Sequence, residues 1–133
     1  MIDVESQIFT KVYDAVISES PECQVISTTT LLPTQFPCVC CEESDNYPLL
    51  TRRDTSTNEH DVAVMYEVNV FTNSRSGKKE EAKKLFNVVD GVFDSLGFTR
   101  QSKMPINVDS SSIYRIVARY TATVSKDEII YRR

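Results

Sequence analysis

The sequence lacks several features that would point directly to a function. It has no tryptophan, three glycines and one histidine in 133 residues. No apolar stretch approaches the roughly 20 residues that a membrane-spanning helix needs. The N-terminal residues do not combine a basic region with an apolar run, so we expect no signal peptide. These absences favour a protein that folds in the cytoplasm and does not insert into a membrane.

Positive charge is also in short supply. The chain has 15 lysines and arginines against 19 acidic residues, which gives a net charge of −4, and its pI is near 5.0. It therefore has no overall positive field to hold nucleic acid through its phosphates. With 41% hydrophobic and 26% charged residues, the composition is that of an ordinary soluble globular protein. A chain of this length fits one domain, over residues 1–133.

Cysteine is the residue type most suggestive of a metal site, with four copies at Cys23, Cys38, Cys40 and Cys41. In an extended strand, Cys38 and Cys40 point to one face and Cys41 to the other. The three thiols cannot converge on one metal unless that strand is broken. Structural zinc sites usually draw paired ligands from two places, and His60 is the only histidine available. We predict no metal and no disulfide, with the thiols acting as small buried hydrophobes.

Two segments have the apolar spacing of amphipathic helices. Between residue 3 and about residue 18, apolar side chains recur every three or four positions, and Pro21 follows the predicted end. A second helix is predicted from 77 to about 96, with Ser76 as its N-cap and Gly97 as its stop. Each helix therefore presents one apolar face to a core.

Four segments are predicted to form strands, and together with the helices they indicate a fold class. The predicted strands cover 37–43, 62–71, 98–103 and 113–124. The order is helix, strand, strand, helix, strand, strand. This order predicts a two-layer α+β sandwich in which both helices cover one face of a mostly antiparallel, four-stranded sheet. Residues 44–61 are expected to form a long hairpin arm or loop, and residues 125–133 a C-terminal tail whose run DEIIYRR either adds an edge strand or stays loose until something binds it.

Alternation along 62–71 divides that strand into a core face and a second face of mixed character. The second face carries Ala63, Met65 and Phe71, whose apolar side chains would stay partly exposed to water in a monomer. Single exposed apolar residues are normal on a protein surface, so the alternation marks this second face only as a candidate contact surface.

The last predicted strand, 113–124, carries two arginines on the face opposite its apolar residues. These are Arg115 and Arg119. Antiparallel pairing would set one of them near Glu67 of the strand 62–71. Such a pair contributes about 0.2–1 kcal/mol, so it would support the sheet only modestly.

Signatures of catalysis are incomplete in this sequence. The run SRSGKK resembles half a phosphate loop, but Thr72 stands where the leading glycine belongs, and Lys79 follows the lysine in place of serine or threonine. A Cys40–His60 pair could in principle supply a thiol nucleophile, but nothing around these cysteines indicates a sharp turn or an oxyanion hole. We expect no enzymatic activity and no cofactor.

Two basic clusters stand out in this acidic chain: Arg52 with Arg53, and Arg75 with Lys78 and Lys79. The second lies at a predicted helix start, where positive charge opposes the helix dipole at about 0.3–1 kcal/mol per charge. One interpretation is solvated loop charge. The other is that both clusters meet acidic surface on a neighbouring subunit or another protein.

The second half of the chain resembles a known family. The run YEVNVFTNSRSGKKEEAKKLFNVVDGVFDSLGFTR, at 66–100, followed by IYRIVARYTATV, is similar to tail-terminator (tail-completion) proteins of long-tailed bacteriophages and prophages of Gram-positive bacteria. The best marks are the strand 62–71, the SGKK helix start, the run 97–100, and the pairs 114–115 and 119–120. None of these marks is a catalytic signature.

The resemblance implies a structural role in the virion. Proteins of that family have a similar α+β fold and form a hexameric ring that stacks on the finished tail tube, stops its growth and offers a surface to the head-side connector. The implied partners are further copies of this chain, the tail-tube protein and the head-closure or connector protein, with DNA passing through the ring channel. The implied location is the tail or neck, after assembly in the bacterial host cytoplasm.

Contact residues are expected at the second face of the strand 62–71, at the basic clusters and at the arginines of the last strand. They are Arg52, Arg53, Ala63, Met65, Phe71, Arg75, Lys78, Lys79, Arg115 and Arg119. Two alternatives stay open: a head-closure or adaptor protein of the phage neck, and a small binding module of ferredoxin-like shape with the cysteines as its site.

Overall fold

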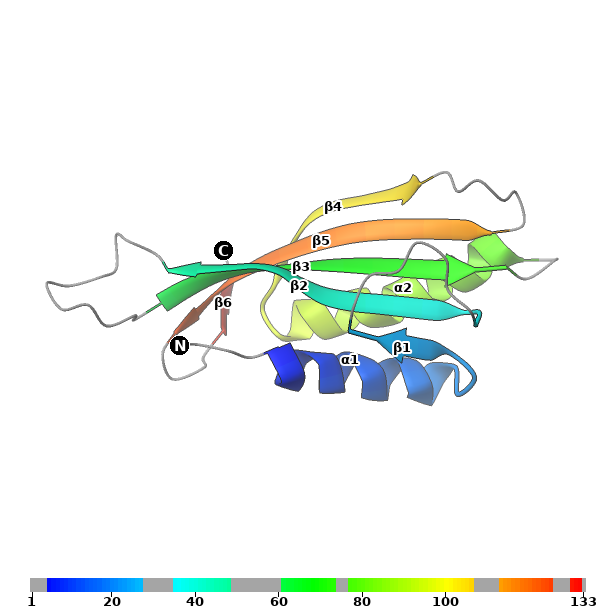
Figure 1. The fold of residues 1–133 in the computed structure, drawn as a ribbon, viewed down its shortest axis with the longest axis horizontal. Coiled ribbons are helices and arrows are strands. Elements are labelled where there is room, and N and C mark those ends of the chain that lie inside the picture. The colour runs from blue at the N-terminus through cyan, green and yellow to red at the C-terminus, as the bar shows by residue number, and fades with distance from the viewer. Residues whose placement is uncertain are drawn as a thin grey trace, which may run out of the picture.

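Two helices pack on one face of a six-stranded sheet in the computed structural model of the chain (Figure 1). The structure describes residues 5–27, 35–48, 61–73, 77–106, 113–125 and 130–132. In chain order, its elements are α1 (Glu5–Glu19), β1 (Gln24–Ile26), β2 (Cys38–Pro48), β3 (Asp61–Thr72), α2 (Lys78–Ser95), β4 (Thr99–Ile106), β5 (Tyr114–Ser125) and β6 (Ile130–Arg132).

The sheet has the strand order β1-β2-β3-β5-β4, with β6 added to β5. β1 runs parallel to β2, and the other pairs are antiparallel. β3 pairs with the whole length of β5 on one side. On the other side, β4 pairs with residues 115–121 of β5 and β6 with residues 122–124, so the two shorter strands share one edge of β5.

The predicted α+β fold is confirmed, with both helices on one face of a mostly antiparallel sheet. The four predicted strands are present, and two more join the sheet. β1 was not predicted, whereas β6 is the edge strand that was one of two alternatives for the C-terminal tail. Residues 44–48, assigned in the sequence to an arm or loop, continue β2 and pair with β3. The remainder of that segment, 49–60, lies outside the described residues.

The core lies between the helices and the sheet. Its side chains come from the apolar stripes of α1 and α2 and from the inward faces of β2, β3 and β5, as alternation predicted. Four aromatic rings form its centre. The Phe93 and Tyr120 rings stack with centroids 4.4 Å apart, while Phe98 meets Tyr66 and Phe93 edge-on. Such pairs contribute about 0.5–1.5 kcal/mol each beyond the burial of their area.

The start of α2 differs from the prediction. Gly77, and not Ser76, is the N-cap, and no side chain caps the helix; Ser76 itself lies outside the described residues. Gly77 has a φ of 105°, which glycine adopts because it has no Cβ to clash. The hydroxyl of Thr72, at the end of β3, donates a 2.6 Å hydrogen bond to the carbonyl of Lys78. This contact ties the strand to the first turn of the helix.

The end of α2 agrees with the prediction. Gly97 has a φ of 91°, and its amide donates to the carbonyl of Asp94 over 3.1 Å, while the amide of Phe98 donates to that of Phe93 over 2.9 Å. These bonds satisfy carbonyls that the helix end would otherwise leave open. The turn places Phe98 directly in the aromatic centre of the core.

Candidate interaction surface

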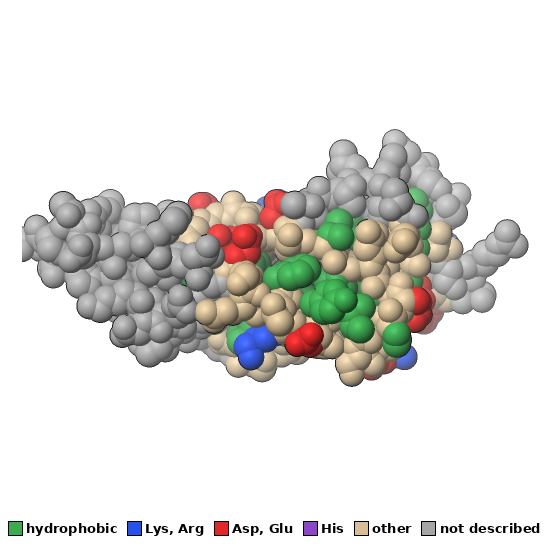
Figure 2. All heavy atoms as spheres, turned by 60° about the horizontal axis from the view of Figure 1, so that its bottom comes forward, with side chains coloured by type: hydrophobic (Ala, Val, Ile, Leu, Met, Phe, Trp, Pro, Cys, Tyr) green, Lys and Arg blue, Asp and Glu red, His purple; other side chains and the backbone are tan. Residues whose placement is uncertain are grey.

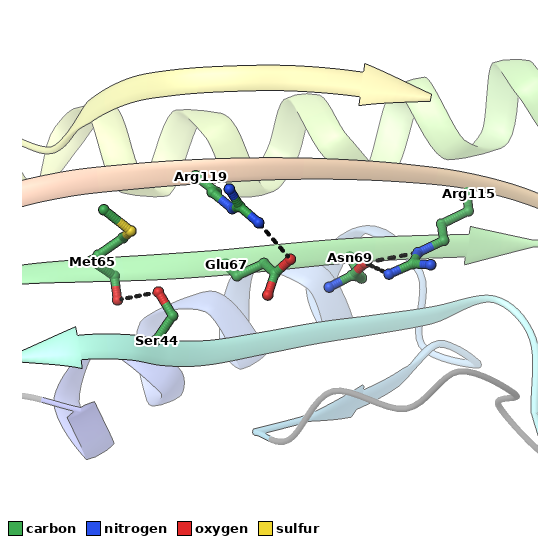
Figure 3. Close-up of polar contacts among 6 residues, drawn as sticks. All are labelled: Ser44, Met65, Glu67, Asn69, Arg115 and Arg119. Carbon is green, nitrogen blue, oxygen red and sulfur yellow. Dashed lines mark hydrogen bonds and ion pairs between the residues drawn. The ribbon is translucent and has the colours of Figure 1, made fainter. Parts of the chain in front are cut away.

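The sheet face opposite α1 and α2 is the surface on which the sequence placed most of its described contact residues. Figure 3 looks onto it, with both helices behind the strands. We call it the helix-free face. Its central side chains, in register across β2, β3, β5 and β4, are Cys40, Glu67, Asn69, Met104, Arg115, Val117 and Arg119.

Part of this face is buried within a single chain, which corrects one premise of the sequence analysis. Ala63 and Phe71 are fully buried, so their side chains are not exposed to a neighbouring chain. Phe71 packs in a small apolar cluster with Cys38 and Cys40. Alternation identified the face correctly, but it could not show that other segments of the same chain cover it.

Two methionines contribute accessible apolar surface to the helix-free face. Met104 is 52% exposed, and Met65 is partly exposed. Beside Met65, β2 has a bulge at which the hydroxyl of Ser44 donates to the carbonyl of Met65 over 3.1 Å (Figure 3). Because methionine side chains adapt to irregular surfaces, this region can pack against a partner of varied shape.

The predicted pairing between an arginine of the last strand and Glu67 is confirmed. Arg119 stands opposite Glu67 in the register, and its Nη2 lies 3.8 Å from the Glu67 Oε1 (Figure 3). The Arg119 side chain is 58% exposed, and an exposed pair at this distance is worth about 0–1 kcal/mol. The pair therefore adds little to stability.

Arg115 is held in place by two neighbours on the same face (Figure 3). Its Nε and Nη2 donate hydrogen bonds to the Oδ1 of Asn69 over 2.9 and 2.7 Å, and its guanidinium carbon lies 5.3 Å from the centroid of the Phe71 ring. A guanidinium only donates hydrogen bonds, so the Asn69 side chain must turn its oxygen toward Arg115. The arginine is thus oriented while it stays partly exposed.

This arrangement leaves the amide nitrogen of Asn69 unpaired. Asn69 is fully buried, and its Nδ2 has no hydrogen-bond partner among the described residues. An unpaired buried donor costs about 1–3 kcal/mol, and asparagine is uncommon within strands. Asn69 was not predicted as a contact residue, although an asparagine flanked by Val68 and Val70 in the middle of a strand was the signal that could have found it.

The basic helix start is only partly described. Lys78 is partly exposed and Lys79 exposed, whereas Arg52, Arg53 and Arg75 lie outside the described residues. The two lysines are followed by Glu80 and Glu81 in the first turn of α2. These carboxylates favour the positive end of the helix dipole, so the helix start is less unfavourable than the lysines alone suggested.

An acidic surface lies at the end of the helix layer, where α1 finishes and α2 begins. A hollow of about 130 Å³ there is lined by Glu19, Ser20, Glu22, Glu81, Lys84 and Leu85. Lys84 reaches across to α1, with its Nζ 3.0 Å from the Glu19 Oε1. The carboxylates of Glu22 and Glu81 add a local negative excess.

The outer side of α1 carries a second apolar surface. Phe9 and Ile17 are partly exposed, Tyr13 is 43% exposed, and the rings of Phe9 and Tyr13 have centroids 6.2 Å apart. Figure 2, which brings the α1 side forward, shows hydrophobic side chains gathered there among acidic ones. Phe9 also packs against the main core, so it lies between the core and this outer row, which the sequence did not predict.

A polar cavity of about 250 Å³ lies between α2, β4 and β5, lined by Asp90, Asp94, Phe98, Thr99, Arg100 and Tyr120. The hydroxyl of Tyr120 donates to the Oδ1 of Asp90 over 2.8 Å, and Arg100 Nη1 lies 3.3 Å from the same oxygen. Burial, followed by the hydrogen bond to Asp90, raises the pKa of Tyr120 above its ordinary value. These contacts join the helix to the sheet, which is a structural role.

The cysteines lie as the alternation predicted. Cys38 and Cys40 belong to the small cluster on the helix-free face, whereas Cys41 and Cys23 face the main core. All four thiols are buried and unbridged. Burial raises the pKa of Cys23 and of Cys41 to about 12. Thiols that remain protonated are poor nucleophiles and poor metal ligands.

Comparison with known proteins supports the fold alone. No family model matches the chain, and no curated protein matches it. One solved structure, whose name carries no functional description, is 13% identical, with a TM-score of 0.52, over 89% of this chain and 90% of its own. At that identity the likeness extends to the α+β fold and no further. None of the described helices is long and apolar enough to cross a membrane.

Proposed function

We propose that this chain is a tail-terminator protein of a long-tailed phage or prophage, a structural protein that acts as a ring of identical copies. In this role the ring caps the tail tube, stops its polymerisation and offers a docking surface to the head-side connector. The observation that carries the proposal is the helix-free face, which presents the exposed Met104 and the oriented, partly exposed Arg115.

A closed ring requires two different surfaces on each chain, because each copy meets its two neighbours through unlike patches. The described residues offer such a pair. The helix-free face combines apolar side chains with Arg115, which pairs with no described carboxylate, and the helix layer combines the apolar row of α1 with the carboxylates of Glu22 and Glu81. Apolar contact and opposite charge at the two patches are the combination that sets register and partner choice.

The same surfaces suit a second role in the phage neck, that of a head-closure or adaptor protein. Such a protein also forms rings and also needs surfaces for two different neighbours. The difference between the roles lies in what fails when the protein is absent. A tail terminator limits tail length, whereas a head-closure or adaptor protein joins a finished tail to the head.

Electron microscopy of particles from a strain that lacks this chain tests the proposal. Over-long tails would support termination. Tails of normal length that stay detached from heads would favour the joining role. Complete virions of ordinary appearance would contradict both. Re-expression of the chain in the same strain is the control, and it should restore normal particles.

A metal assay tests the remaining alternative, a small binding module with a cysteine site. Protein purified under reducing conditions should contain no stoichiometric zinc, because the raised pKa of the buried thiols disfavours the thiolate that binds metal. One zinc per chain would overturn the structural role.

A further inference from the structure

Among the described residues, the neighbours of Arg115 leave one edge of its guanidinium open. Its Nε and Nη2 both donate to one oxygen of Asn69, which occupies one side of the guanidinium. The Nη1 atom and the second hydrogen of Nη2 form the opposite edge, and no described carboxylate lies within ion-pair distance of it. Two parallel N–H groups at such an edge match the two oxygens of a carboxylate.

We propose that Arg115, oriented by Asn69, binds a carboxylate from a neighbouring copy of this chain. Asn69 acts here as a positioning residue. Its carbonyl fixes the guanidinium, and the unpaired Nδ2 is the consequence of turning that carbonyl toward the arginine. The Phe71 ring under the guanidinium restricts it further. A pre-organised side chain loses less entropy on binding than a free one.

Charge on the rest of the helix-free face does not occupy this edge. Glu67 is paired with Arg119 on the other side of Asn69, and Glu42 stands opposite Glu67 in the register, further from Arg115. Arg119 is also more exposed and has no orienting asparagine. It therefore provides a matched control: an arginine on the same face and strand that lacks the pre-organisation.

The acidic end of the helix layer is the surface that complements this edge. Glu22 is exposed, Glu81 is partly exposed, and both line the hollow between the helices. A head-to-tail contact brings the helix layer of one copy to the helix-free face of the next. This assignment of the occupant rests on the proposed ring.

Sedimentation velocity on purified chains at micromolar to millimolar concentration tests the proposal. Four proteins are compared: the wild type, R115Q, the control R119Q, and the double variant E22Q/E81Q. We expect the association constant to fall at least tenfold for R115Q and for E22Q/E81Q, and less than threefold for R119Q. Circular dichroism spectra and melting temperatures verify that each variant is folded.

A double-mutant cycle establishes whether the two sides touch. Combining R115Q with E22Q/E81Q should weaken association by about as much as either change alone, because both remove one contact. If the combined variant instead associates about a hundredfold more weakly than the wild type, the two effects are independent, and Arg115 does not contact Glu22 or Glu81 directly. Equal weakening by R115Q and R119Q would overturn the special role of Arg115.

Asn69→Asp provides a variant with a different signature. The aspartate keeps an oxygen facing Arg115 and neutralises its charge, so the fold should be as stable as the wild type or more so, while association falls as in R115Q. Undiminished association of this variant would contradict the proposal. If the wild-type chain stays monomeric at 1 mM, the group that binds Arg115 does not come from a second copy of this chain. The tail-terminator role is tested separately, by the tail lengths in the strain that lacks the chain.

Discussion

Because several of its thiols are buried, this protein is expected to lose stability at alkaline pH. Burial raises the pKa of Cys23 and Cys41 to about 12, and the pKa of Cys38 is raised by its hydrogen bond with Cys40 and by burial. In the unfolded chain each thiol titrates near its ordinary value of 9.0. Below pH 9 the thiols are protonated in both states. Above pH 9 only the unfolded chain releases these protons, so stability falls as the pH rises.

The size of the effect follows from the linkage of protonation to folding. One pH unit above the unfolded pKa, each thiol that stays protonated in the folded state lowers the free energy of unfolding by about 1.4 kcal/mol. Three such thiols give about 4 kcal/mol at pH 10, a large part of the 5–15 kcal/mol typical of a domain. Above pH 10, Tyr120 adds to the loss because its pKa is also raised from 10.0.

Urea unfolding at pH 8, 9 and 10, followed by circular dichroism with a reductant present, measures this loss. Cys41→Ala is the informative variant. It should cost about 1 kcal/mol at pH 8 through the cavity it leaves, and it should then lose about 1.4 kcal/mol less than the wild type between pH 8 and pH 10. A free energy of unfolding that changes by less than about 0.5 kcal/mol over this range would refute the reasoning.

Three further predictions concern two single hydrogen bonds and the basic start of α2. Tyr120→Phe should lower the free energy of unfolding by about 1–2 kcal/mol in urea titrations, because it removes the hydrogen bond to Asp90; an unchanged value would show that the bond is not formed. Thr72→Val should cost about 1 kcal/mol by removing the bond to the Lys78 carbonyl, and a gain in stability would contradict that role. Reversing Lys78 and Lys79 to glutamate should reduce virion yield in a plaque assay while the melting temperature stays the same or rises, because the helix start loses two unfavourable charges. A normal yield would remove these lysines from the interface.

Alternation predicted the parts of the fold that depend on one strand and its immediate partner. The inward face of β3 and the facing positions of β5 form the core as expected, and the Glu67–Arg119 pair follows from antiparallel register. The period of two identifies which residues share a face. It does not show what covers that face, and this is why Phe71 was expected at an interface but packs against Cys38 and Cys40 within the chain.

The orienting contact between Asn69 and Arg115 could not be predicted from either strand alone. The two residues are 46 positions apart in sequence, and they are not directly opposite, since Asn69 pairs with Val117 and Arg115 with Phe71. Their hydrogen bonds depend on a long side chain that reaches diagonally across the sheet. The sequence shows that an asparagine and an arginine lie on these strands. Predicting that they contact each other requires knowing the strand register and the side-chain rotamers.

The arrangement of strands along β5 has a consequence for how the chain should be handled. β6 completes the edge of β5 that β4 leaves vacant, at Ala122, Thr123 and Val124. Without it, these residues would present unpaired backbone amides and carbonyls, a template on which strands of other molecules can add. We therefore expect truncation before Ile130 to yield a protein that aggregates through open sheet edges. β6 therefore protects this edge of β5 from pairing with strands of other molecules, in addition to its contribution to the sheet.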